Sequence, residues 1–323
     1  MGRTWLTWLC IAAVSTALLA CDDGSPTAGI DRGGVRTPVA AQGPIEGFGS
    51  IVIGGVHYDL DVATLRVDGS AVAEADLALG QVVTVTGTRG DGETRVRADS
   101  VSSTTNVQGP VQSLDIGAGT LTVLGQSIVT KPTTVYVLGT SSPSLASLHV
   151  GDKVRVSGLV GAAGGIEATR IERRSASAEL RVSGTVADVD TASSRFRLNA
   201  LVVSYAAAVS IEGFPQGRPE NGDPVIVVGS ALGANGELLA RTLERHGAEL
   251  EEREGRELEI EGLITRFVSP LDFDVAGVRA TTTAATTYEH GTAADLRLDL
   301  KVHVKGRVNA AQLLEARKIE IED

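Results

Sequence analysis

Apolar and polar residues alternate in a short stretch that recurs four times along the chain. The four copies are LGQVVTVTG at 79–87, GDKVRVSG at 151–158, GDPVIVVG at 222–229 and DLKVHVKG at 299–306. Their leading residues stand at positions 80, 151, 222 and 299, so the spacing between copies is nearly constant. A regular spacing of this size predicts tandem copies of one small structural unit.

Each copy is predicted to form a β-strand. Alternation places the valines on one face of an extended chain, and Thr84, Arg155 or His303 on the other. Valine suits such a half-buried, pleated surface. The leading glycine predicts a tight turn with positive φ, and Asp299, which replaces it in the fourth copy, also tolerates turn conformations. The trailing glycine is expected to end the strand or to bend it.

The first repeat shows the predicted plan most clearly. Strands are expected at 45–53, 56–60, 64–68, 79–87 and 94–101, with a hairpin turn at Gly54-Gly55. Residues 74–79 are expected to be a connector with about one helical turn. Three strands, a connector and two strands is the order of an OB-type Greek-key barrel. The spacing between copies is too short for an immunoglobulin-like sandwich with its seven strands.

The sequence therefore predicts an all-β chain of four tandem, small OB-like Greek-key β-barrels. The abundance of glycine (38 residues) and the few stretches of helical periodicity agree with an all-β fold. The predicted repeats are 43–106, 107–177, 178–250 and 257–323. Residues 251–256 are predicted to be a charged, solvated linker because acidic and basic residues dominate this stretch.

The first 20 residues resemble a signal peptide. Arg3 precedes a largely apolar run that is too short for a confident membrane span. The run ends in LLAC at 18–21, which resembles the lipobox of bacterial lipoproteins and implies acylation of Cys21. An ordinary secretory signal with an incidental cysteine is the alternative. Residues 21–42 are predicted to be the lipidated cysteine and a flexible tether. The expected location is outside the cytoplasm, lipid-anchored to a bacterial membrane on its periplasmic face or at the cell surface.

Composition narrows the range of partners. The formal net charge is −11, aromatic residues make up 3% of the chain, and both tryptophans, Trp5 and Trp8, lie within the predicted signal peptide. Binding to nucleic acid needs positive charge to neutralise phosphates, and single-strand binders also need aromatic stacking surfaces. We therefore expect no nucleic-acid partner. No cofactor is predicted.

The first repeat resembles a known family. GPIEGFGSIVIGGVHYD at 43–59, VDG at 67–69 and the stretch 79–87 are similar to a family of exported bacterial proteins called domain of unknown function 5666. The second repeat is similar at 109–112 and 150–158, and the third and fourth mainly at the recurring strand. The resemblance implies several copies of a barrel-like domain, often in a lipoprotein, and a place in the cell envelope. It implies no catalytic residues.

Two groups of residues in the first repeat are candidates for a catalytic or a metal-binding site. Ser50 lacks the flanking glycines of a hydrolase nucleophile turn, so a strand bend is the favoured interpretation. His57, with Asp59 and Asp61, is a weak candidate for a metal site. We expect the five histidines to occupy exposed strand or turn positions instead.

Three Asp-x-Asp pairs are candidates for calcium binding. They lie at 59/61, 188/190 and 272/274, and alternate spacing would place both carboxylates of a pair on one strand face. None continues into an EF-hand loop. Aspartates of turns and solvent-facing strand positions are the favoured interpretation.

The function expected from the sequence is that of a non-enzymatic cell-envelope lipoprotein. Its tandem barrels would form a binding or scaffold module that presents edges and loops to a protein or glycan partner. One alternative is an OB-type protein that binds oligosaccharide or nucleic acid. The other alternative is a hydrolase or metal-dependent enzyme with a site between repeats.

Overall fold

The computed structural model describes residues 36–246 and 254–322. Strands account for 56% of the structure, which has 25 strands, three short 3-10 helices and no α-helix in the described residues. No helix in this part of the chain is long and apolar enough to span a membrane. The predicted signal peptide, Cys21 and residues 251–253 of the charged linker lie outside the described residues.

The first two repeats contain strands β1 to β12. The strands of the first repeat are β1 (Thr37–Pro44), β2 (Ile51–Ile53), β3 (Val56–Asp59), β4 (Thr64–Val67), β5 (Ser70–Ala71), β6 (Val82–Arg89) and β7 (Val96–Ser103). The strands of the second are β8 (Val107–Asp115), β9 (Thr120–Val123), β10 (Gln126–Val137), β11 (Lys153–Val160) and β12 (Ile166–Arg173). The 3-10 helices η1 (Glu74–Asp76) and η2 (Leu145–Ser147) precede β6 and β11. The helical turn predicted in the first connector is thereby confirmed.

The last two repeats contain strands β13 to β25. The strands of the third repeat are β13 (Leu180–Thr185), β14 (Ala187–Asp190), β15 (Arg195–Leu198), β16 (Leu201–Ser204), β17 (Ser210–Glu212), β18 (Pro224–Leu232) and β19 (Leu238–Arg245). The strands of the fourth are β20 (Glu257–Ser269), β21 (Asp272–Val275), β22 (Val278–Thr281), β23 (Thr287–Glu289), β24 (Lys301–Val308) and β25 (Leu314–Glu322). The 3-10 helix η3 (Ala293–Asp295) precedes β24.

The four recurring sequences form β6, β11, β18 and β24, which confirms the strand prediction. The alternating valines are all buried, with at most 1% of their surface exposed: Val83, Val85, Val154, Val156, Val225, Val227, Val302 and Val304. The leading residue has positive φ in every copy, including Asp299 with φ of 58°. The trailing glycine bends its strand but does not end it, because the strand continues through a register shift at that residue.

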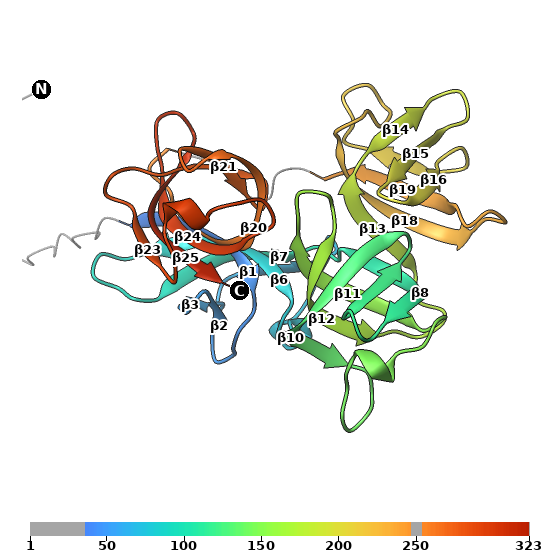
Figure 1. Ribbon diagram of the computed structural model, residues 1–323, viewed down its shortest axis with the longest axis horizontal. Helices are drawn as coiled ribbons and strands as arrows, with labels where there is room; N and C mark the ends of the chain where they lie inside the picture. Colours follow the sequence, from blue (N-terminus) through green and yellow to red (C-terminus); the bar gives the residue numbers. More distant parts are fainter. Residues whose placement is uncertain (1–35, 247–253, 323) are drawn as a thin grey trace, which may run out of the picture. The chain divides into compact units, whose positions relative to one another are not determined.

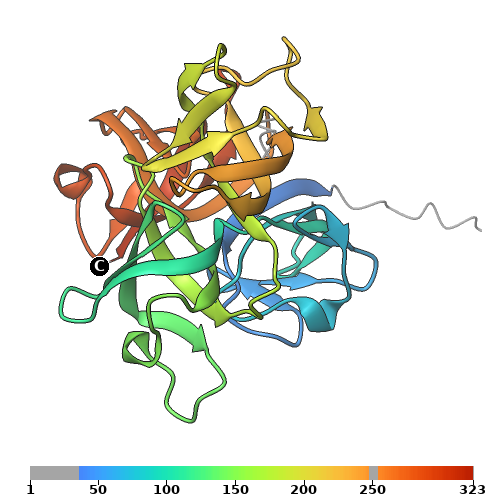
Figure 2. The ribbon, with the colours of Figure 1, turned by 90° about the vertical axis from the view of Figure 1, so that its right-hand side faces the viewer.

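The prediction of four separate OB-like barrels is wrong. The chain is organised as a β-solenoid of about seven turns. Strand pairing crosses the predicted boundaries, because β1 pairs with β20 (Figure 1) and β8 pairs with β13. The β1–β20 pair is parallel, with Val39 opposite Glu257. The strands consequently join into one sheet of 13, from the first and fourth repeats, and one of 12, from the second and third (green to orange in Figure 2).

The sequence predicted that residues 37–42 belong to a flexible tether, and this prediction is wrong. They form most of β1, which pairs with β6 on one side and with β20 on the other. Ala40 and Ala41 are completely buried in this strand. Small side chains allow β1 to lie between two sheet segments, a role that local composition does not reveal.

Apolar side chains form three clusters beneath these sheets. One cluster is continuous from the second repeat to the third, so Val107 and Val182 belong to the same core. A second cluster lies in the first repeat. The third lies in the fourth repeat and includes Ala40 from β1. Two of the three cores, like the sheets, thus extend beyond a single repeat.

Candidate functional site

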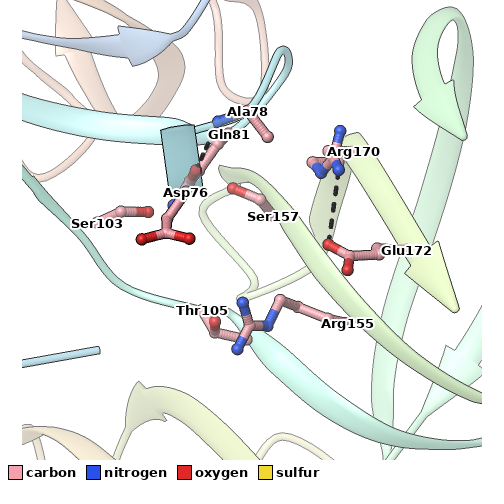
Figure 3. Close-up of a pocket in the computed structure, with 9 residues that line it drawn as sticks. All are labelled: Asp76, Ala78, Gln81, Ser103, Thr105, Arg155, Ser157, Arg170 and Glu172. Atoms are coloured by element: carbon pink, nitrogen blue, oxygen red, sulfur yellow. Dashed lines mark hydrogen bonds and ion pairs between the residues drawn. The ribbon is translucent and has the colours of Figure 1, made fainter. Parts of the chain in front are cut away.

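A polar cavity of about 40 Å³ lies where the first and second repeats meet (Figure 3). The side chains come from the η1 connector and the end of β7 on one side, and from β11 and β12 on the other. The lining residues are Asp76, Ala78, Gln81, Ser103, Thr105, Arg155, Ser157, Arg170 and Glu172. Ser103, Thr105 and Ser157 are buried, whereas the charged lining residues are half-buried or, for Asp76, exposed.

Side chains of the second repeat hold the segment that leads into β6. Ser157 Oγ accepts a hydrogen bond of 2.9 Å from the Val82 N–H. Thr169 Oγ1 donates to the Gly80 carbonyl at 2.5 Å, and Arg170 Nη1 donates to the Leu79 carbonyl at 3.1 Å. The recurring sequence of the first repeat is therefore fixed by its neighbour as well as by its own fold.

Asp68 is the ionic centre of this junction. Its carboxylate accepts hydrogen bonds of 2.8 Å from the Thr105 N–H and Oγ1, and lies 3.5 Å from Arg155 Nη2 and 3.9 Å from Arg181 Nε. Burial lowers the pKa of Arg155, and the nearby charge of Asp68 opposes that effect. Arginine nevertheless stays charged at neutral pH because its ordinary pKa is so high.

The charges that line this cavity balance. Arg155 and Arg170 face Asp76 and Glu172, and Arg170 lies 3.5 Å from Glu172. A volume of about 40 Å³ offers space for about one water molecule. A water molecule bound in this cavity could bridge polar groups of the two repeats, but the cavity offers little space for a larger ligand.

A second cavity, of about 190 Å³, lies where the first and fourth repeats meet. It is larger than the first, and charged residues make up most of its lining. The residues are Val39 and Arg89 from the first repeat, and Glu257, Leu258, Glu259, Lys305, Gly306 and Arg317 from the fourth. β1, which pairs with β20, contributes Val39 to this lining.

The metal candidates in the first repeat do not form a common site. Asp59 lies 2.6 Å from Arg95, and His57 Nδ1 lies 2.9 Å from Ser50 Oγ. Asp61 is exposed. Within residues 36–246 and 254–322, no group of three His, Cys, Asp or Glu residues is arranged to hold a metal ion.

The contact between Ser50 and His57 was not expected from the sequence. Ser50 is buried at the bend before β2, with a φ of 132°, and His57 lies on β3, opposite Val52 of β2. A catalytic triad also needs a carboxylate that orients the histidine. In the part of the chain that the structure describes, no carboxylate bonds to His57, so the pair is incomplete as a nucleophile site.

The other two Asp-x-Asp pairs already have protein partners. Arg266 donates to both Asp272 and Asp274, at 2.5 and 2.7 Å. Asp190 accepts hydrogen bonds from the Ser193 N–H and hydroxyl within a turn. A calcium ion would have to displace these partners before it could bind the carboxylates.

The sequence predicted an exposed position for His303, but the structure buries this residue. Only 4% of its surface is exposed, and its Nε2 lies 2.9 Å from Glu259 Oε1. Acidic residues alternate along β20 at 257, 259 and 261, opposite basic residues along β24 at 301, 303, 305 and 307. This complementary alternation on two strands was a signal in the sequence that the two strands pair.

Comparison with known proteins gives a family. No curated protein sequence matches the chain. The family model described as "Domain of unknown function (DUF5666)" matches residues 41–102, 108–172 and 261–320, which together exceed half of the chain. The matches fall on the first, second and fourth repeats. The chain therefore belongs to the DUF5666 family and carries tandem copies of its domain.

Proposed function

We propose that this protein is a non-enzymatic binding scaffold of the bacterial cell envelope, anchored through a lipid on Cys21. The LLAC sequence at 18–21 supports the anchor, and the tandem copies support a scaffold. A lipid anchor would hold the repeats at a membrane surface without a spanning segment. The partner would be an envelope protein or glycan.

The observation that carries the proposal is the composition of the two cavities. Each is lined by residues of two different repeats, because strand pairing and side-chain contacts join the repeats. A ligand bound in the larger cavity, or a partner that covers both junctions, would contact two repeats at once and not a single domain. The tandem arrangement would thus create binding surfaces that a single repeat lacks.

A crosslinking pull-down from native envelope extract tests the proposal. The bait is the tagged chain from residue 22 to 323, and a tag alone is the background. Two variants alter the junctions, Arg155→Gln at the first and Arg317→Gln at the second. Arg279→Gln removes the same charge from an exposed position on β22 and is the matched control.

The expected result is a protein or glycan that the wild-type chain and the control enrich equally, and that at least one junction variant enriches less. Capture of nothing above the tag alone would contradict a binding scaffold. Equal capture by all four chains would contradict binding at the junctions.

A further inference from the structure

Three arginines converge on one carboxylate at the junction of the first and fourth repeats. Arg89 Nη1 lies 3.1 Å from Glu257 Oε2, while Arg307 Nη2 and Arg317 Nη1 lie 3.2 and 3.7 Å from Oε1. Arg89 comes from β6, and the other two come from β24 and β25. One carboxylate carries a single negative charge, so two of these three positive charges have no counterpart at Glu257.

The second carboxylate of the cavity does not make up the difference. Glu259 is buried, pairs with Lys305, and lies beside the buried His303. Among the residues that line the cavity, three fixed positive charges, on Arg89, Lys305 and Arg317, thus stand against two carboxylates. This excess occurs in a chain whose formal net charge is −11.

Two of the arginines keep donor groups that the protein does not use. Arg89 Nε is buried and has no hydrogen-bond partner within the described residues. Arg317 has 62% of its side chain exposed and makes its contact with Glu257 at 3.7 Å, beyond hydrogen-bond distance. The exposed guanidinium of Arg317 is therefore the donor group that a ligand in the cavity can reach, whereas Arg89 Nε is enclosed by protein.

We propose that this cavity binds a phosphate group. A phosphate group would neutralise the excess positive charge of the lining, and its oxygens match the planar donor fork of guanidinium. A volume of about 190 Å³ equals that of about six water molecules, which is enough for a group of five heavy atoms. This inference deepens the proposed function, on which it rests, by naming the ligand chemistry at one junction.

Isothermal titration calorimetry on the purified chain 22–323, at low ionic strength and pH 7.5, tests the inference. The probes are inorganic phosphate, glucose 1-phosphate and acetate. Saturable binding of phosphate with little or none of acetate is the expected result. Tighter binding of glucose 1-phosphate would assign the site to a phosphate carried by a glycan, and tighter binding of inorganic phosphate to the free ion. Equal binding of acetate, or no saturable phosphate binding, would overturn the proposal.

Three variants connect the binding to this cavity. Arg317→Gln, at an exposed side chain, is expected to weaken phosphate binding at least about tenfold, the usual effect of losing one charged hydrogen bond. Glu257→Gln removes the internal anion that competes for the arginines, so phosphate should bind more tightly. A purely structural role for Glu257 would not produce that gain. Arg279→Gln should leave the affinity unchanged.

Equal phosphate affinity of Arg317→Gln and Arg279→Gln would overturn the assignment to this cavity. The two proposals can fail separately. Partner capture from envelope extract with no phosphate binding by the purified chain would refute the phosphate site and leave the scaffold. Phosphate binding without capture of any partner would refute the scaffold and leave the site.

Discussion

At the scale of single residues, the trailing position of each recurring sequence has no space for a side chain. A Cβ at Gly87, Gly158 or Gly306 would collide with a backbone carbonyl oxygen of the neighbouring strand, and one at Gly229 would collide with the Leu238 side chain. All four glycines lie at the register shift of a β-bulge. Backbone cannot move aside as a flexible side chain can, so only glycine fits at the first three positions.

Gly87→Ala should therefore destabilise the protein. The added methyl group meets the Arg97 carbonyl across the bulge, and overpacking of this kind typically costs about 1–3 kcal/mol. Thermal unfolding followed by circular dichroism would show the loss as a lower melting temperature. Gly165→Ala, where a Cβ meets nothing closer than 4.0 Å, is the control. Equal melting temperatures for the two variants would contradict the packing argument.

The leading residue of each copy was predictable from the sequence, and the trailing glycine only in part. Gly80, Gly151 and Gly222 have φ of 75°, 94° and 92°, and Asp299 has 58°. Residue type alone indicates this conformation, because few residues tolerate positive φ. The bulge at the trailing glycine depends on the neighbouring strand, so the sequence indicated a bend or an end without distinguishing them.

At the scale of elements, the same pair of hydrogen bonds to an aspartate recurs at the start of β11 and β18. Asp152 accepts a hydrogen bond of 3.0 Å from the His149 N–H and one of 2.9 Å from Arg173. Asp223 accepts one of 2.8 Å from the Glu220 N–H and one of 2.9 Å from Arg245. Each arginine lies on the last strand of its repeat. The carboxylate thus ties the turn to two strands.

These contacts predict that stability falls in acid. The hydrogen bond from Arg245, then that from Glu220, lowers the pKa of Asp223. Burial alone would raise the pKa of Asp152, but hydrogen bonds from His149 and Arg173 outweigh it and lower the pKa. A carboxyl whose folded pKa is depressed stabilises the protein above its unfolded pKa of about 3.9, and loses that effect as pH falls through the folded value.

The double variant Asp152→Asn/Asp223→Asn measures this contribution. At pH 6 its melting temperature should lie below that of the wild type, because amides cannot form the charged contacts with Arg173 and Arg245. Below about pH 4 the difference should shrink, because these carboxyls become protonated first in the unfolded chain and, at still lower pH, in the folded wild type. A difference in melting temperature that stays constant from pH 6 to pH 2.5 would show that these two carboxylates do not cause the loss of stability in acid.

The sequence indicated which residues form strands, but not which polar faces are covered. His303 and Glu259 occupy the polar face of alternating strands, and such a face normally meets solvent. Here the first repeat covers it, and Lys305 donates to the Gly54 carbonyl at 3.1 Å. The residues of the cavity between the first and fourth repeats are therefore absent from the sites that the sequence suggested.

At the scale of the whole described chain, β1 connects regions that are far apart in the sequence. It pairs with β6 of its own repeat and with β20 of the fourth, where Ala41 lies opposite Glu259. No local pattern in residues 37–44 specifies a partner at the other end of the chain. The repeats were therefore predictable from their spacing, but the pairing of strands from different repeats into one sheet was not.

The turn at Gly54-Gly55 offers a test of that union. A Cβ at Gly54 would collide with the ring of His303, whereas a Cβ at Gly55 would meet nothing within 4 Å. Both glycines have positive φ, of 56° and 75°, so alanine costs backbone strain at either position. Gly54→Ala should therefore lose more stability than Gly55→Ala, by about 1–3 kcal/mol for the added clash.

Hydrogen exchange locates where that extra loss falls. If the first and fourth repeats are one cooperative unit, Gly54→Ala should speed exchange in β1, β20 and β24 together, although the substitution lies outside all three strands. Gly55→Ala should speed exchange only near the β2–β3 hairpin. Faster exchange confined to that hairpin in both variants would mean that the contact with His303 does not couple the repeats, and that the pairing of β1 with β20 holds them together without it.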